Sequence, residues 1–143
     1  MSLTQTATNA FKTGLMNGTF NFNTDTFKMA LYTGAATLDA ATNTYDSTNE
    51  ASGGNYLPGG QSLTVTVTPT TGSDPSSTVA YISFANVTWT GAITARGALI
   101  YKYNGTTNPS VCVLDFGSDK TSTTQFQVQF PAATTSSAII RIA

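Results

Sequence analysis

The chain has 143 residues and a formal net charge of −1, and only 9% of its residues are charged, against about 25% in typical globular domains. Its polar residues are mainly 28 Thr, 13 Ser and 10 Asn, so hydroxyls and amides replace charges on the expected surface. The absence of His and the single Cys exclude His-dependent catalysis, His-ligated zinc and an internal disulfide, and six scattered cations give no basic patch for nucleic acid or a membrane surface.

Residues 1–18 are predicted to form an N-terminal helix or arm. An apolar residue recurs every four positions, at Leu3, Ala7, Phe11 and Leu15. Ser2 and Gln5 have the spacing of a capping box, and Gly18 would end the helix. This helix could dock on the chain's own sheet or on a neighbouring subunit. The four apolar residues are therefore candidate interface residues.

The rest of the chain predicts about seven short strands in a single domain that covers residues 1–143. They are expected at 27–32, 63–68, 79–89, 95–103, 111–116, 125–130 and 138–142. The run at 79–89 should bend, since its alternation slips near Phe84, and 111–116 is apolar on both faces, as in a central strand. Residues Pro69 to Pro75 read as a turn cluster. The fold class that follows is an antiparallel β-sandwich or a partly open barrel.

Residues 33–60 form a long surface excursion in this prediction, because they are rich in Thr, Asn, Ala and Gly. They contain oxygen ligands of the kind that calcium takes, namely Asp39, Asn43, Asp46, Asn49 and Glu50. Their spacing matches no EF-hand loop, and turn-forming side chains explain them more simply. We therefore predict no metal site.

Arg96, one of two arginines, lies at the head of the strand expected at 95–103. It could pair with Asp115 or Asp119 in the same domain, or contact another subunit, for which its planar fork of donors is suited. We keep it as a candidate interface residue. Asp115 is near the end of the strand expected at 111–116, and Asp119 and Lys120 are expected in the turn that follows it.

The aromatic residues also allow two interpretations. They could form a sugar-binding platform or the core of the sandwich, and the residues concerned are Trp89, Tyr101, Tyr103, Tyr56 and Tyr32. Cys112 lies within an apolar strand and is expected to be a buried thiol. With one Glu and no His, the sequence predicts no catalytic residues and no cofactor site.

The chain resembles small virion structural proteins of tailed bacteriophages over roughly residues 7–142, through the segments FKMALYTGAATLDAATNTYDSTNE, GGNYLPGGQSLT, ITARGALIYK, VLDFGSDK and FPAATTSSAIIRIA. The resemblance implies a non-enzymatic capsid decoration (cement) protein that bridges capsid subunits in the virion, after assembly in the bacterial host cytoplasm. The implied partners are the major capsid protein or other virion proteins, and further copies of this chain, with a trimer favoured. The alternative is a tail, neck or fibre component that binds a receptor or glycan.

Overall fold

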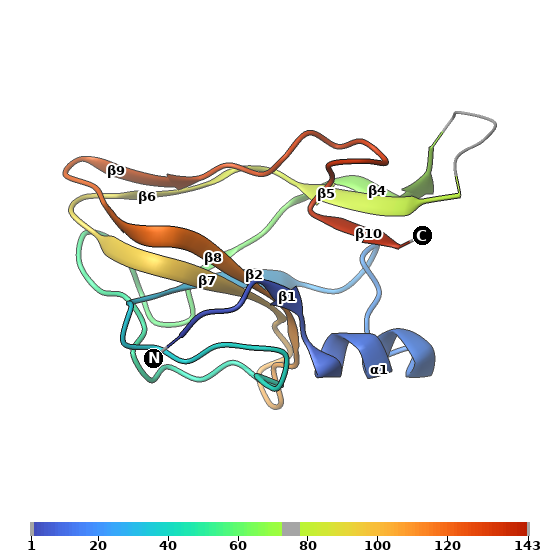
Figure 1. Cartoon of the computed structure of the whole chain (residues 1–143), viewed down its shortest axis with the longest axis horizontal. Helices are drawn as coiled ribbons and strands as arrows, with labels where there is room; N and C mark the ends of the chain where they lie inside the picture. Colours follow the sequence, from blue (N-terminus) through green and yellow to red (C-terminus); the bar gives the residue numbers. More distant parts are fainter. Residues whose placement is uncertain (1, 73–77, 143) are drawn as a thin grey trace.

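The computed structural model describes residues 2–72 and 78–142, which form a mainly β fold with two facing layers of strands and a short helix outside one of them (Figure 1). The elements in chain order are β1 (Thr6–Ala7), α1 (Asn9–Asn17), β2 (Phe27–Tyr32), β3 (Gln61–Ser62), β4 (Val65–Thr71), β5 (Ala80–Phe84), β6 (Val87–Thr90), β7 (Thr94–Lys102), β8 (Ser110–Thr121), β9 (Gln125–Val128) and β10 (Ile140–Ile142). No linker divides them among the described residues.

One layer is a five-stranded sheet in the order β1-β8-β7-β2-β3. The other consists of a three-stranded sheet, β10-β5-β4, and a two-stranded ribbon, β6-β9. All pairings between these strands are antiparallel, and the sheets of the described residues do not close into a barrel. The prediction of a mainly β, sandwich-like antiparallel fold is therefore confirmed.

Most predicted strands appear, with shifted ends. The strand at 27–32 has the predicted bounds, and the run at 79–89 divides into β5 and β6 at the point where its alternation slips. The turn predicted from Pro69 is wrong at its beginning, because β4 continues to Thr71. An edge strand tolerates Pro, since its missing N–H can face away from the ladder. Residues 73–75 of that predicted turn lie outside the described residues.

The N-terminal helix is shorter than predicted. It begins after Thr8, whose side chain accepts a hydrogen bond from the Phe11 N–H, and it ends at Gly18 in a left-handed conformation. The preceding residues are extended, with Leu3 bridged to Leu38 and β1 paired to β8. Their backbone groups find partners in distant segments, and this non-local pairing overrides the helical spacing of the sequence.

The five-stranded sheet is buried on both faces. The larger part of the core lies between the two layers, with Phe27 from the five-stranded sheet and Trp89 from β6 of the second layer. The opposite face carries Tyr32, Leu99 and Tyr101, which pack under residues 33–60. That segment lacks regular strands, as expected, but it is not merely a surface excursion. Ala36 and Leu38 of the segment are buried against this face and form a third layer, whereas Ala51 and Tyr56 pack into the main core.

Candidate functional site

The four apolar residues of the predicted helical stripe do not share one face. Leu3 packs so closely on β7 that a Cβ at Gly97 would clash with it, and Ala7 is paired with Cys112 in the sheet. Phe11 is on the helix but only 4% exposed, within the chain's own core. Leu15 alone of the four is well exposed, at 40%. The prediction of one helical stripe over residues 3–16 is therefore wrong, and a role of these four residues in an interface stays a prediction.

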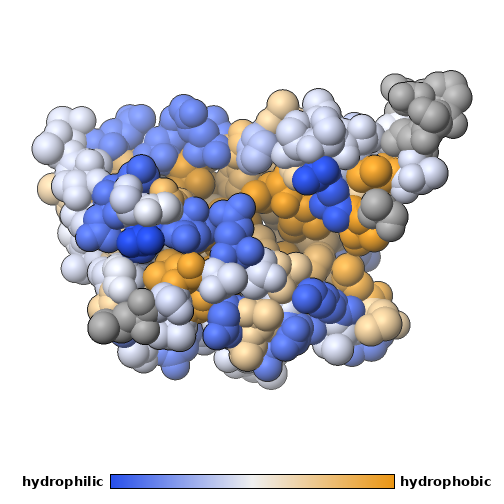
Figure 2. All heavy atoms as spheres, in the orientation of Figure 1, coloured by the Kyte–Doolittle hydropathy of each residue, from blue (hydrophilic) through white to orange (hydrophobic). Residues whose placement is uncertain are grey.

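Leu15 instead lines an apolar groove between the helix and the three-stranded sheet, which we call the α1–β10 groove. Its volume is about 270 Å³, and its apolar walls come from Phe11, Leu15, Phe20, Ile82, Ile140 and Ile142. None of its lining residues is charged. In Figure 2 hydrophobic residues gather on the right-hand half of the face, between β10 and α1. This groove is a largely apolar recess in a chain whose polar residues are mainly hydroxyls and amides.

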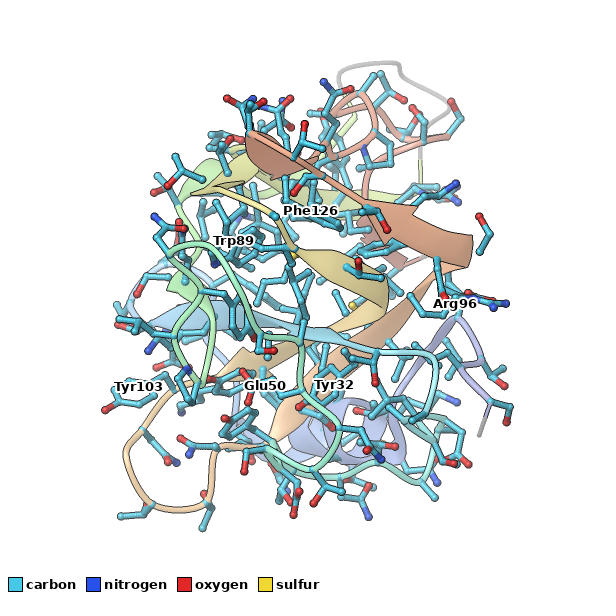
Figure 3. The ribbon with its side chains drawn as sticks, turned by 90° about the vertical axis from the view of Figure 1, so that its left-hand side faces the viewer. Tyr32, Glu50, Trp89, Arg96, Tyr103 and Phe126 are labelled. Carbon is cyan, nitrogen blue, oxygen red and sulfur yellow. The ribbon has the colours of Figure 1, made fainter. Side chains whose placement is uncertain are left out.

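Arg96 makes an ion pair within the domain. Its Nε lies 3.3 Å from Asp115 Oδ1, and both side chains remain partly exposed, at 37% and 27%. The Gly117 N–H, and after it Arg96, lowers the pKa of the Asp115 carboxyl. Figure 3 shows Arg96 at the surface, well away from Glu50 and Trp89. The geometry thus supplies the intradomain partner that the sequence allowed.

The turn predicted at Asp119 and Lys120 is wrong. Both residues belong to β8, which continues to Thr121. The strand is irregular here, because the register passes from Ala95 opposite Lys120 to Gly97 opposite Asp115. The bulged stretch of β8 uses more residues than β7 does, and this accommodates polar residues within one long strand.

Glu50, the only Glu of the chain, fastens residues 33–60 to the five-stranded sheet. Its carboxylate accepts hydrogen bonds from Tyr45 Oη at 2.6 Å, from the Gly59 N–H at 2.7 Å, and from Tyr56 Oη. Tyr101 Oη donates to the Gly59 carbonyl at 2.7 Å, from the sheet side. In Figure 3 Glu50 lies beside Tyr32 below the sheet. We call these residues the Glu50–tyrosine cluster.

The phenols of the cluster keep their protons far above neutral pH. Burial first, and then the nearby Glu50 carboxylate, raises the pKa of Tyr101 to about 12. The pKa of Tyr56 and of Tyr45 is raised further, by burial and by the hydrogen bonds that these phenols donate to Glu50. Tyr45 and Tyr56 therefore act as hydrogen-bond donors to the carboxylate, and Tyr101 as a donor to the Gly59 carbonyl, which is a structural role.

The possible calcium ligands of residues 33–60 are engaged in local turns. Asp39 Oδ1 accepts from the Ala41 N–H at 2.8 Å, and Asp46 Oδ1 accepts from the Thr48 N–H at 2.7 Å. Both are side-chain turns of the kind that Asp commonly forms. Within residues 2–72 and 78–142, no three His, Cys, Asp or Glu side chains are grouped to hold a metal ion.

The aromatic residues do not form the predicted alternative of a sugar-binding platform. Trp89, Tyr32 and Tyr101 are each 1% exposed, and Tyr56 is also buried. Tyr103 is exposed, but Lys28 Nζ covers its ring at 4.5 Å from the centroid. The interpretation of these residues as core is confirmed for the four buried ones.

Sequence reasoning missed a second recess, which lies beside β9. Its volume is about 430 Å³, and its walls include Gln125, Gln127 and Gln129 with Phe116 and Lys120 of β8. The alternation of Gln with Phe and Val at 125–130 predicted one solvated face. It could not show that this strand would lie at the open edge of a two-stranded ribbon.

The single helix of the described residues is too short to cross a membrane. Comparisons of the chain with protein-family models, with curated proteins and with solved structures find no match.

Proposed function

We propose that this chain is a non-enzymatic structural protein of a bacteriophage virion, which decorates the capsid and stabilises the head by bridging capsid subunits. The observation that carries the proposal is the α1–β10 groove, an uncharged apolar recess with the exposed side chains of Leu15 and Ile142 at its border. Exposed apolar surface of this kind marks sites of protein–protein contact. The resemblance of the sequence to phage virion proteins names the partner, the major capsid protein.

The low charge of the chain supports a role in a dense assembly. Six cations and seven anions over 143 residues give weak long-range repulsion between copies. Hydroxyl and amide groups can also be buried at a contact without the desolvation cost of charges. When many copies attach to one shell, modest contacts add up through their high effective concentration.

The test is binding of the purified protein to phage heads that lack it, with two variants of the helix. Leu15→Gln places an amide in the α1–β10 groove and should weaken binding at least severalfold. Met16→Gln is the matched control, since Met16 is the next residue of the helix, is 83% exposed and does not line the groove. The control should bind as the original protein does.

Two results would count against the proposal. If the heads bind no protein, or only a few copies, the chain belongs to the tail, neck or a fibre, and a glycan screen is the next experiment. If Leu15→Gln and Met16→Gln bind equally well to heads, the α1–β10 groove is not the attachment surface.

A further inference from the structure

The strand β9 has one edge with no partner strand. It pairs with β6 alone, in the register Val87–Val128, Thr88–Gln127, Trp89–Phe126 and Thr90–Gln125. Just outside the ladder, where β6 ends and β9 begins, the Gly91 N–H donates to the Thr124 carbonyl at 2.8 Å. Hydrogen-bonded pairs alternate along an antiparallel ladder, so Trp89–Phe126 and Val87–Val128 are the bonded pairs.

The same alternation fixes the direction of the remaining backbone groups. The N–H and C=O groups of Gln125 and Gln127 point away from β6, towards the free edge. Both residues, with Gln129, line the recess of about 430 Å³ beside the strand. Open space therefore borders the edge of β9, and Lys120 of β8 lies on the other side of that space.

This edge lacks the features by which proteins usually prevent strands from pairing. Residues 125–129 contain no charge and no Pro, and the register with β6 has no bulge. The other three edges of the second layer are obstructed. The edge of β6 is covered, because Asn55 Oδ1 accepts from the Thr90 N–H and Gln61 Nε2 donates to the Thr88 carbonyl. β4 contains Pro69 and two register shifts against β5, and β10 carries Arg141. β9 is thus the edge best suited to receive a strand.

We propose that β9 pairs with β9 of a second copy of this chain, antiparallel, about a two-fold axis at Gln127. The two β6–β9 ribbons then join into one four-stranded sheet, β6-β9-β9-β6. In this register Gln127 lies opposite Gln127 of the partner subunit, and Gln125 lies opposite Gln129 of the partner subunit. A two-stranded ribbon alone is marginally stable, and the added strands strengthen it.

The side chains are complementary on both faces in this register. On the outer face glutamine side chains of the two subunits lie opposite one another. Within one subunit these side-chain amides are already linked by hydrogen bonds. Gln129 Nε2 donates to Gln127 Oε1 at 2.8 Å, and Gln127 Nε2 donates to Thr88 Oγ1 at 3.2 Å. On the inner face Phe126 lies opposite Val128 of the partner subunit, an aromatic and β-branched pair of the kind that stabilises sheets. No like charges oppose each other between these residues.

This contact is independent of the attachment to capsid proposed above. It uses β9, whereas the α1–β10 groove lies between the helix and the three-stranded sheet. A two-fold contact is isologous and closes at two copies, so it predicts a dimer or a larger assembly with an even number of copies. It is therefore in conflict with the free trimer that the sequence resemblance favours.

The first experiment measures the solution mass of the protein by light scattering over a range of concentrations. The original protein should have the mass of two chains, and Gln127→Lys should have the mass of one, because two lysines would then face each other at the axis. Thr90→Lys is the control. This variant adds the same charge to β6, opposite Gln125 and away from the free edge of β9. The Thr90→Lys protein should therefore keep the mass of two chains. Fluorescence of the buried Trp89 reports whether each variant is folded.

The second experiment does not depend on a disruptive variant. Gln127→Cys in a Cys112→Ala background should form an intermolecular disulfide on mild oxidation, since Cα atoms of hydrogen-bonded antiparallel pairs lie about 5.5 Å apart. Thr90→Cys in the same background should not. The proposal is wrong if the original protein has the mass of one or three chains, if Gln127→Lys keeps the mass of two, or if Gln127→Cys forms no more disulfide than Thr90→Cys. A dimer that fails to bind heads would refute the proposed function alone.

Discussion

Tyr56 Oη joins Leu31 to Glu50: it accepts a hydrogen bond from the Leu31 N–H at 2.8 Å and donates its own proton to the Glu50 carboxylate. One phenol oxygen thus connects a central strand to a segment without regular structure. The Tyr56 hydroxyl already accepts one hydrogen bond and donates another. It therefore cannot become the acceptor if a donor replaces the Glu50 carboxylate. This phenol is one of several connections between residues 33–60 and the five-stranded sheet, beside the hydrogen bonds from Tyr101 Oη to the Gly59 carbonyl and from the Ala51 N–H to the Leu31 carbonyl.

Glu50→Gln should destabilise the fold by about 1–3 kcal/mol, because one of the two phenol donors would then face an amide donor. Tyr45 and Tyr56 donate to different carboxylate oxygens, so no orientation of the amide satisfies both. Urea unfolding measures the change. Asp46→Asn is the control, since Asp46 is exposed and the amide oxygen can still accept from the Thr48 N–H. Equal stability of the two variants would contradict the role of the cluster.

High pH should unfold the protein through the same cluster. The pKa of Tyr101 is raised to about 12 and that of Tyr32, Tyr45 and Tyr56 is raised further, against about 10 in an unfolded chain. The folded form therefore holds protons that the unfolded form releases. The resulting stability is complete below about pH 10 and falls as the pH rises towards 12. Urea unfolding at about pH 8 and about pH 11, followed by Trp89 fluorescence, should show a lower free energy at the higher pH. A free energy of unfolding that does not change between these pH values would exclude the linkage.

Two residues of the helix should respond differently to truncation. Phe11 is buried against the rings of Phe20 and Phe22, at centroid distances of 5.2 and 6.0 Å. Phe11→Ala should therefore cost about 3–5 kcal/mol of stability. Leu15→Ala should cost less than about 1 kcal/mol, because much of that side chain is exposed in the native state. Thermal unfolding of both variants checks this, and similar midpoints would show that Phe11 does not belong to the core.

Arg96→Ala should have little effect at neutral pH, since an exposed ion pair contributes little. The Gly117 N–H is the first cause of the lowered pKa of Asp115, and it remains in this variant. A lowered pKa contributes stability above the unfolded value that is lost as the pH falls below it. Acid unfolding of Arg96→Ala should therefore follow that of the original protein, and Asp115→Asn should lose part of the pH dependence. If Arg96→Ala changes the solution mass, Arg96 lies at a subunit contact after all.

Cys112 should not react with thiol reagents in the folded protein. Burial raises the pKa of its thiol to about 12, so almost no thiolate is present near neutral pH. Reaction with an aromatic disulfide at about pH 8 should be slow until urea unfolds the chain. A rapid reaction of the folded protein would show that the edge of the sheet near β1 opens easily.

The strands could be predicted where residues alternate or are continuously apolar. The run FKMALY corresponds to β2 residue for residue, and the slip in alternation near Phe84 marks the break between β5 and β6. The ends of β4 and β8 could not be predicted. Pro69 is tolerated because β4 is an edge strand, and Gly117 has a positive φ within the bulged stretch of β8. Both facts depend on neighbouring strands that a single sequence does not show.

The candidate site was predicted less well than the fold. A spacing of four residues fits a helix, but residues 3–7 are extended because Leu38 and β8 supply partners for their backbone. Glu50 was considered as a possible calcium ligand, and its tyrosine partners are brought to it by the irregular path of residues 33–60. A sequence has no periodicity from which such a path can be read. The free edge of β9 is likewise a property of strand order.

The third layer restricts how the chain can change in length. Insertions or deletions within residues 33–60 would uncover the face of the five-stranded sheet that carries Tyr32 and Tyr101. The exposed turn at 104–108 is different, because the Asn104 side chain satisfies the backbone N–H groups of Thr106, Thr107 and Asn108 within the turn itself. A peptide displayed on this protein therefore belongs at 104–108. The longest irregular segment, the usual choice for a fusion, is the one that has to keep its length.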